Sequence, residues 1–433
     1  MPPRSVVIVL AAVLCIGASA APRPVRGDVS GDGRADLVVG GAQLLTIQPL
    51  GGRAATRSQR ATALSTGDFN GDGLADVTVG AAGTVTVLYG RRADGYTGPT
   101  SRFTPGQGGV PRLGTGHGFG NTLTTSDFNR DGYVDLAVGA PETTLDTAAT
   151  HGGAAIVLYG SRRGLTSSGA LVLSENTPGV VGFSQHSRLF GAGLAAGDVT
   201  GDGYNDLVVT APSGRPGYDI GGAIHVFKGS AKGVRIAGNT MVTSGNVDGR
   251  VMDVQACAGG SAGADNKANT ARCTRKPFGW SVRTGRFHRG KYADVIAGIG
   301  DGKLLVLRGG PSGIDKRRLK TLALPGVTGT SAPADDHAGS LAAGDVDKDG
   351  YTDLVAVARG TGRVAILYGS ADGPSRPSWI GQGGVNAALL DVDGDSVPEL
   401  ATADGEAVRI RWIKNRRVAK TTVLPLPGRL IAR

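Results

Sequence analysis

The sequence repeats a nine-residue pattern of acids whose spacing suits a metal ion. The pattern is D-x-[DNST]-x-D-[GS]-x-x-[DE], and it occurs in six copies. Calcium takes about six to eight oxygen ligands in a flexible shell, and a tight loop can point oxygens inward from alternate positions. Side chains at positions 1, 3, 5 and 9 and the backbone carbonyl at position 7 would supply them, so we predict up to six calcium sites. The predicted metal ligands are Asp28, Ser30, Asp32, Arg34 and Asp36; Asp68, Asn70, Asp72, Leu74 and Asp76; Asp127, Asn129, Asp131, Tyr133 and Asp135; Asp198, Thr200, Asp202, Tyr204 and Asp206; Asp345, Asp347, Asp349, Tyr351 and Asp353; and Asp391, Asp393, Asp395, Val397 and Glu399.

The spacing separates this pattern from two alternatives. An EF-hand starts in a similar way but places its closing acid at position 12, next to a helix, whereas here the closing acid is at position 9 and β-favouring residues follow. A single D-x-N-x-D-G sequence is also typical of a turn without an ion. Six copies that all carry the acid at position 9 favour metal binding, although the last copy has Ser396 where glycine is expected.

A seventh copy, Arg286–Asp294, has lost most of its acids. Arg286 stands at position 1 and Gly290 at position 5, and Asp294 at position 9 is the acid that remains. We predict that this loop holds no calcium and that Arg286 or Lys291 pairs with Asp294.

Short apolar strands must position these loops. Each loop runs into a strand such as Leu136–Val138, and a second strand such as Ala155–Tyr159 often ends in an aromatic residue followed by glycine. Abundant Gly and Asp with four Glu argue against a helical protein, and 40% hydrophobic residues argue against disorder. Strand, loop and turn repeat as a four-stranded unit, and seven units favour an all-β, seven-bladed β-propeller. We expect the C-terminal segment 428–433 to complete the first blade and close the ring.

The ends and the least regular stretch carry further signals. Residues 1–20 read as a secretory signal, with Arg4, an apolar run and an Ala-Ser-Ala cleavage site; an uncleaved anchor is the alternative. Residues 21–433 would then form a single propeller, secreted or extracellular, with association with the cell surface as an alternative. Within it, 229–276 is expected to be a blade insertion, either decorative or a binding element. Cys257 and Cys273 are expected to form a disulfide, because a lone pair in an oxidising compartment usually bridges; a redox or metal role is the weaker alternative.

The repeats resemble a known family. Phe-Gly pairs such as Phe119-Gly120 lie eight residues before a loop, and Gly139-Ala-Pro141 follows the next strand. Together with the acid loops, they resemble the FG-GAP repeat of the integrin α-subunit propeller and its bacterial relatives. The resemblance covers nearly all of residues 21–433. It implies a seven-bladed propeller with calcium in loops between the first and second strands of blades. Ligands in such a family vary widely and include proteins, glycans and other domains of the same chain.

Charge gives the remaining indication of function. The net charge is +10, yet the six intact loops hold 20 acids and 3 bases, so the rest of the chain holds 16 acids and 43 bases. We predict a monomeric binding or adhesion module with no transmembrane segment, whose partner is an extracellular protein or an anionic glycan or cell-wall polymer rather than a specific nucleic acid. The alternative for the bases is an even, solvated spread. No catalytic residue and no cofactor other than calcium is predicted, because H-E-x-x-H and P-loop motifs are missing. The alternative function is a secreted enzyme on an anionic polymer, a polysaccharide lyase or phosphoester hydrolase.

Overall fold

Short β-branched and apolar segments after each acid loop form the strands of this protein. A computed structural model describes residues 9–10, 27–41, 43–49, 54–81, 83–92, 99–116, 118–145, 151–182, 188–212, 222–243, 278–299, 302–324, 340–358, 361–404 and 406–425. The described residues contain strands and turns but no helix. They therefore include no helix with the length and hydrophobicity that a membrane-spanning helix needs.

The strands fall into seven sheets of four in the described part of the chain. Blades 1 to 4 comprise β1 (Val9–Leu10), β2 (Leu37–Gly40), β3 (Leu44–Gln48) and β4 (Ala55–Ser58); β5 (Ala63–Gly67), β6 (Asp76–Ala81), β7 (Thr84–Leu88) and β8 (Thr100–Phe103); β9 (Thr122–Ser126), β10 (Asp135–Ala140), β11 (Ala154–Tyr159) and β12 (Thr166–Leu173); and β13 (Gly193–Gly197), β14 (Asp206–Ala211), β15 (Ala223–Lys228) and β16 (Arg235–Thr243). Blades 5 to 7 comprise β17 (Val282–Gly285), β18 (Asp294–Gly298), β19 (Lys303–Gly310) and β20 (Gly313–Ala323); β21 (Leu341–Gly344), β22 (Asp353–Ala358), β23 (Arg363–Leu367) and β24 (Ser378–Gln382); and β25 (Asn386–Leu390), β26 (Glu399–Ala403), β27 (Ala407–Lys414) and β28 (Arg417–Pro425).

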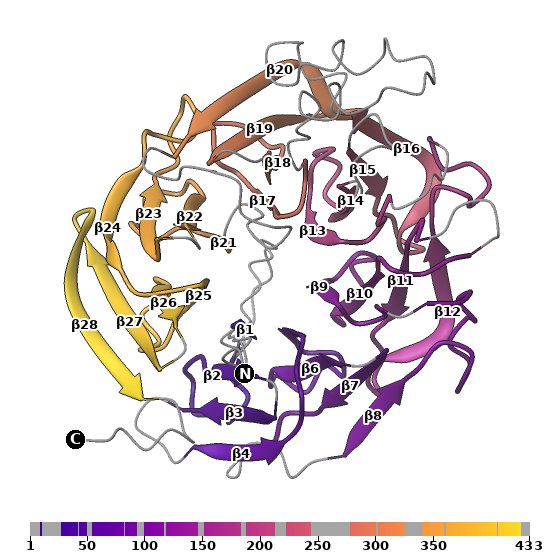
Figure 1. Cartoon of the computed structure of the whole chain (residues 1–433), viewed down its shortest axis with the longest axis horizontal. Helices are drawn as coiled ribbons and strands as arrows, with labels where there is room; N and C mark the ends of the chain where they lie inside the picture. Colours follow the sequence, from indigo (N-terminus) through magenta and orange to yellow (C-terminus); the bar gives the residue numbers. More distant parts are fainter. Residues whose placement is uncertain are drawn as a thin grey trace, which may run out of the picture.

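Each sheet is an antiparallel meander, and the seven sheets stand around a ring (Figure 1). The first strand of each blade lies toward the centre of the ring and the fourth lies at the outside. The predicted all-β, seven-bladed β-propeller is therefore confirmed. The second strands β10 and β14 are buried along their whole length, because each blade packs between two neighbours. The core accordingly lies between blades, as where Val208 of blade 4 joins the same apolar cluster as Val295 of blade 5.

The Phe-Gly pairs fix the contact between neighbouring blades. Phe119 is buried, and Gly120 adopts a positive φ of 88°. A Cβ added at Gly80, near the end of β6, would lie 1.9 Å from the Gly120 carbonyl oxygen, so Gly80 could not carry a side chain unless the blades moved apart. Gly80 is thus required by the close approach of two blades, and Gly120 by its positive φ.

Ring closure involves backbone bonds between acid loops. The amide of Ala35, at position 8 of the first loop, donates to the carbonyl of Asp391, at position 1 of the last loop, at 2.8 Å. The innermost position beside β2 is taken by β1, which pairs Val9 with Gly40. We had expected the C-terminal segment in that position, and residues 428–433 lie outside the described residues.

Three other expectations also fall wholly or partly outside the described residues. The expected signal segment 1–20 is described only at Val9–Leu10, and Cys257 and Cys273 are not described. Of the expected insertion 229–276, the part up to Thr243 forms a turn and the regular strand β16, and residues 244–277 lie outside the described residues.

Candidate metal centres

The acid loops connect the first strand of each blade to the second, where the sequence placed them. The acid at position 1 folds the loop around its own side chain. In the second loop, Asp68 Oδ1 accepts the amide of Gly71 at 2.7 Å and Asp68 Oδ2 accepts the amide of Gly73 at 2.9 Å. Gly73 stands at position 6 with a φ of 86°, which an L side chain adopts only with strain. Ser396, which replaces glycine in the last loop, takes the same left-handed conformation with a φ of 68°.

Position 5 fixes the backbone at position 7 in all six intact loops. The Oδ1 of each position 5 acid accepts the amide of the residue two further along, at 2.8 to 3.0 Å. The residues so held are Arg34, Leu74, Tyr133, Tyr204, Tyr351 and Val397, whose carbonyls we expect to face the ion. The local hydrogen bonds thus shape the loop as the sequence pattern requires.

The acid at position 9 is the most buried acid of each loop. Asp76 is fully buried; its Oδ2 accepts the amide of Phe69 at 3.0 Å and its Oδ1 accepts the amide of Gly90 at 2.8 Å. Asp135 and Asp353 make the same two kinds of bond. This acid therefore ties the start of the loop to the end of the third strand.

Burial without a cation disfavours ionised acids in these loops. Burial raises the pKa of Asp76 and of Glu399 to about 8, more than their backbone donors lower it. The same cause raises the pKa of Asp135 and Asp353 to about 7, and neighbouring acids add to it. A bound cation would reverse this effect, because it favours the charged carboxylates.

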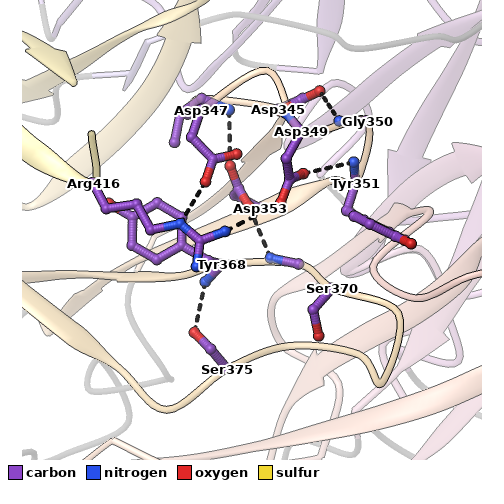
Figure 2. Close-up of polar contacts among 12 residues, drawn as sticks. Asp345, Asp347, Asp349, Gly350, Tyr351, Asp353, Tyr368, Ser370, Ser375 and Arg416 are labelled. Carbon is purple, nitrogen blue, oxygen red and sulfur yellow. Dashed lines mark hydrogen bonds and ion pairs between the residues drawn. The ribbon is translucent and has the colours of Figure 1, made fainter. Parts of the chain in front are cut away.

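Two loops gather their acids most closely. Ligand oxygens of Asp345, Asp347 and Asp353 lie within 4.8 Å of one another, and so do those of Asp391, Asp393 and Glu399. Figure 2 shows the first group, in which Asp345, Asp347, Asp349 and Asp353 surround one small volume. Asp347 Oδ1 is buried and has no hydrogen-bond partner. Because a buried carboxylate oxygen without a donor is unfavourable, these residues fit a hard divalent cation.

The seventh loop contains an internal pair between its remaining acid and a histidine. His288, at position 3, pairs through Nδ1 with Asp294 Oδ2, and both side chains are buried. Our prediction of Arg286 or Lys291 as the partner was wrong: Lys291 Nζ donates instead to the carbonyl of Gly201 in the neighbouring loop, at 2.9 Å. The histidine in the sequence at position 3 was the signal for this pair.

A second buried charged group lies outside the loops. Arg188 donates to Glu175 through Nε and Nη2, both at 3.1 Å, and His225 Nε2 lies 3.1 Å from Glu175 Oε1. Burial alone would raise the pKa of Glu175, but hydrogen bonds from His225 and Arg188 hold it below its ordinary value. His225 is fully buried on β15 and packs 5.2 Å from the ring of Phe190, so the group ties blade 3 to blade 4.

The fold and the loops define a propeller built from repeats with acidic loops, and comparison with known families agrees. The FG-GAP repeat matches residues 119–158, 190–227 and 337–367, and the FG-GAP-like repeat matches residues 68–138. The chain is therefore a β-propeller that contains FG-GAP repeats in these segments.

The related proteins are much longer than the matched segments. Bovine phosphatidylinositol-glycan-specific phospholipase D is 37% identical over 26% of this chain and 14% of its own length. Integrin alpha-PS5 of Drosophila melanogaster is 38% identical over 24% of this chain and 10% of its own. Among solved structures, an Agrocybe aegerita lectin that recognises non-reducing terminal N-acetylglucosamine shares the fold, with a TM-score of 0.55, 14% identity and coverage of 93% of this chain and 92% of the lectin.

Proposed function

We propose that this chain is an extracellular, calcium-stabilised binding module for an anionic polymer. In this proposal residues 1–20 are a secretory signal whose cleavage would remove β1, and the segment 428–433 would then complete blade 1 beside β2. Cys257 and Cys273 would form a disulfide, and the protein would be monomeric. The matches cover 10% of the integrin α subunit and 14% of the phospholipase D, so they support a shared repeat used as a binding module rather than the whole activity of either relative.

Calcium would be held by the six intact loops. Positions 1, 3, 5 and 9 offer side-chain oxygens and position 7 its carbonyl, and the unpartnered Asp347 Oδ1 supports this assignment. The ion would supply positive charge that neutralises crowded, buried acids. The chain's own hydrogen bonds from positions 1, 5 and 9 shape the loop that receives it.

A row of exposed cations on β20 carries the proposal of an anionic partner. Lys316, Arg317, Arg318 and Lys320 are all exposed on this outermost strand of blade 5. Asp315 lies nearby, with its Oδ2 3.6 Å from Arg318 Nε. Several solvated cations along one exposed strand suit a polymer with repeated carboxylate or sulfate groups.

Direct binding of the full chain to acidic polymers tests this function. We would immobilise polygalacturonate, heparin and neutral dextran and measure binding by biolayer interferometry in millimolar calcium. K316E/R317E should weaken binding to the acidic polymers at least tenfold and leave dextran unbound. The matched control is R57E/R60E, which changes the net charge equally at exposed residues of blade 1.

Two results would contradict the proposal. Equal weakening by both double variants would show that net charge, rather than the β20 row, governs binding. If unsaturated sugar products form from polygalacturonate or heparin, as measured by their absorbance, the result would favour the lyase alternative.

A further inference from the structure

The loop of blade 6 already contains a cation that comes from blade 7. Arg416 lies in the turn between β27 and β28; its Nε donates to Asp347 Oδ2 at 2.7 Å and its Nη2 donates to Asp349 Oδ2 at 3.2 Å (Figure 2). The guanidinium also lies 4.7 Å from the centroid of the Tyr368 ring, at cation–π distance. Arg416 of blade 7 thus donates to two acids of blade 6 that we expect to bind calcium.

The turn that carries Arg416 is a strained place for an arginine. Lys414 pairs with Arg417, so Asn415 and Arg416 form a two-residue hairpin turn, and their φ values are 49° and 60°. Glycine is favoured at the second position of such a turn, because an L side chain is strained in the left-handed region. The contacts of Arg416 with Asp347 and Asp349 offset this strain.

In two other loops Oδ2 of the position 5 acid also accepts a hydrogen bond, but from a side chain of the same loop. Asn70 Nδ2 donates to Asp72 Oδ2 at 2.9 Å, and Asn129 Nδ2 donates to Asp131 Oδ2 at 2.9 Å. In blade 6 position 3 is Asp347, which has no N–H to donate and adds a fourth acid. Arg416 takes the place of the missing amide, and together with Lys348 it brings the four-acid loop to a net charge of −2, the value of the loops that contain Arg34 or Arg130.

The arrangement would allow a further cation to replace the guanidinium of Arg416. The side chain of Asp347 is 9% exposed and its Oδ1 has no partner, so the loop retains an oxygen for a further cation. The side chain of Arg416 is 51% exposed and reaches the loop from a surface turn. It can therefore swing into water without opening any apolar core.

We propose that Arg416 is an internal cation that occupies the acids of the blade 6 loop without calcium and gives way to calcium when the ion binds. The inference rests on the proposed calcium-binding function. Calcium at this loop must compete with a guanidinium for Asp347 and Asp349. A divalent ion about 5 Å from a guanidinium in a water-like dielectric is repelled strongly enough to weaken binding roughly tenfold.

Calcium titration of the full, decalcified chain tests the inference. Isothermal titration with calcium chloride should show one site that binds roughly tenfold more tightly in R416Q than in the parent protein. R416G should show the same gain, and it keeps the hairpin because glycine is favoured at that turn position. R417Q, a change at the exposed neighbouring residue, is the matched control and should bind calcium as the parent does.

A second background assigns the effect to the correct loop. D345N removes the position 1 acid of blade 6, so R416Q should change nothing when it is combined with D345N. Parent-like or weaker calcium binding by both R416Q and R416G would overturn the inference, and so would a gain that persists in D345N. If no variant binds calcium, the calcium proposal itself fails; if all bind calcium equally, only the role of Arg416 fails.

Discussion

Asp76 offers the sharpest test of the metal loops, because its charge should differ between the metal-free and the loaded protein. It is fully buried and accepts amides from Phe69 and Gly90. Burial raises its pKa to about 8 in the loop without an ion, so at pH 7 the acid is mostly neutral there. A bound calcium ion would hold it as a carboxylate.

The substitution Asp76→Asn should therefore cost more in calcium than in chelator. The amide turns one acceptor into a donor that faces a backbone N–H, and a buried donor left unsatisfied costs about 1–3 kcal/mol. Loss of one calcium site at a concentration of about 100 Kd removes a further ~2.7 kcal/mol of stability. We expect a total loss of about 4–6 kcal/mol in calcium and about 1–3 kcal/mol in chelator.

Urea unfolding at pH 7, followed by tryptophan fluorescence in millimolar calcium and in EGTA, measures both values. Asp294→Asn is the matched control, because Asp294 stands at the same position of the loop that His288 closes. Its loss of stability should be the same in both solutions. An equal loss for Asp76→Asn in calcium and in EGTA would refute the assignment of Asp76 as a calcium ligand, and a calcium-dependent loss for Asp294→Asn would refute the predicted absence of calcium in the seventh loop.

Two further predictions concern protons and the seventh loop. In chelator the pKa of Asp76 and Glu399 is about 8 in the folded protein and near 4 in the unfolded chain, so between these values the folded protein binds more protons. Its melting temperature should therefore fall from pH 5.5 to pH 8, and a higher melting temperature at pH 8 would contradict this. His288→Leu removes the partner of Asp294 and should lower the free energy of unfolding by about 1.5–3 kcal/mol in calcium and in chelator alike. A loss confined to one solution, measured by urea unfolding, would contradict it.

The parts of the structure that depend on neighbours in sequence could be predicted. A nine-residue loop forms its own hydrogen bonds, as between Asp68 and Gly73, so its spacing alone indicates its shape. The four-stranded units follow from strands and turns that alternate along the chain, and seven such units define the propeller.

Contacts between distant segments could not be predicted in the same way. Arg416 and Asp347 are 69 positions apart, and His225 and Glu175 are 50 apart. Nothing in the composition of either segment specifies the partner, because the register between blades decides which side chains meet. Our prediction of the partner of Asp294 was wrong for a related reason. Opposite charge favoured Arg286 or Lys291, but the shorter side chain of His288 is the one that pairs with Asp294.

The acid loops also connect the blades, which explains why one interface needs added cations. The position 8 amide of a loop donates to the position 1 carbonyl of the preceding loop, as Ala75 does to Asp28 at 2.8 Å and Ala35 to Asp391 at 2.8 Å. An ion that orders position 1 therefore also orders the bond to the next blade. In the last loop position 8 is Pro398, which has no amide hydrogen to donate to blade 6.

Two basic side chains cross that interface instead. Arg416 of blade 7 reaches Asp347 of blade 6, and Lys348 of blade 6 donates through Nζ to the carbonyl of Asp395 of blade 7 at 3.4 Å. One contact runs from the β27–β28 turn to the blade 6 loop and the other from the blade 6 loop to the blade 7 loop, so together they hold blades 6 and 7 where the backbone bond is missing. Calcium bound in the blade 6 loop, as proposed, would replace the contact of Arg416, so the stability of this interface should depend on how the ion and Arg416 share the acids.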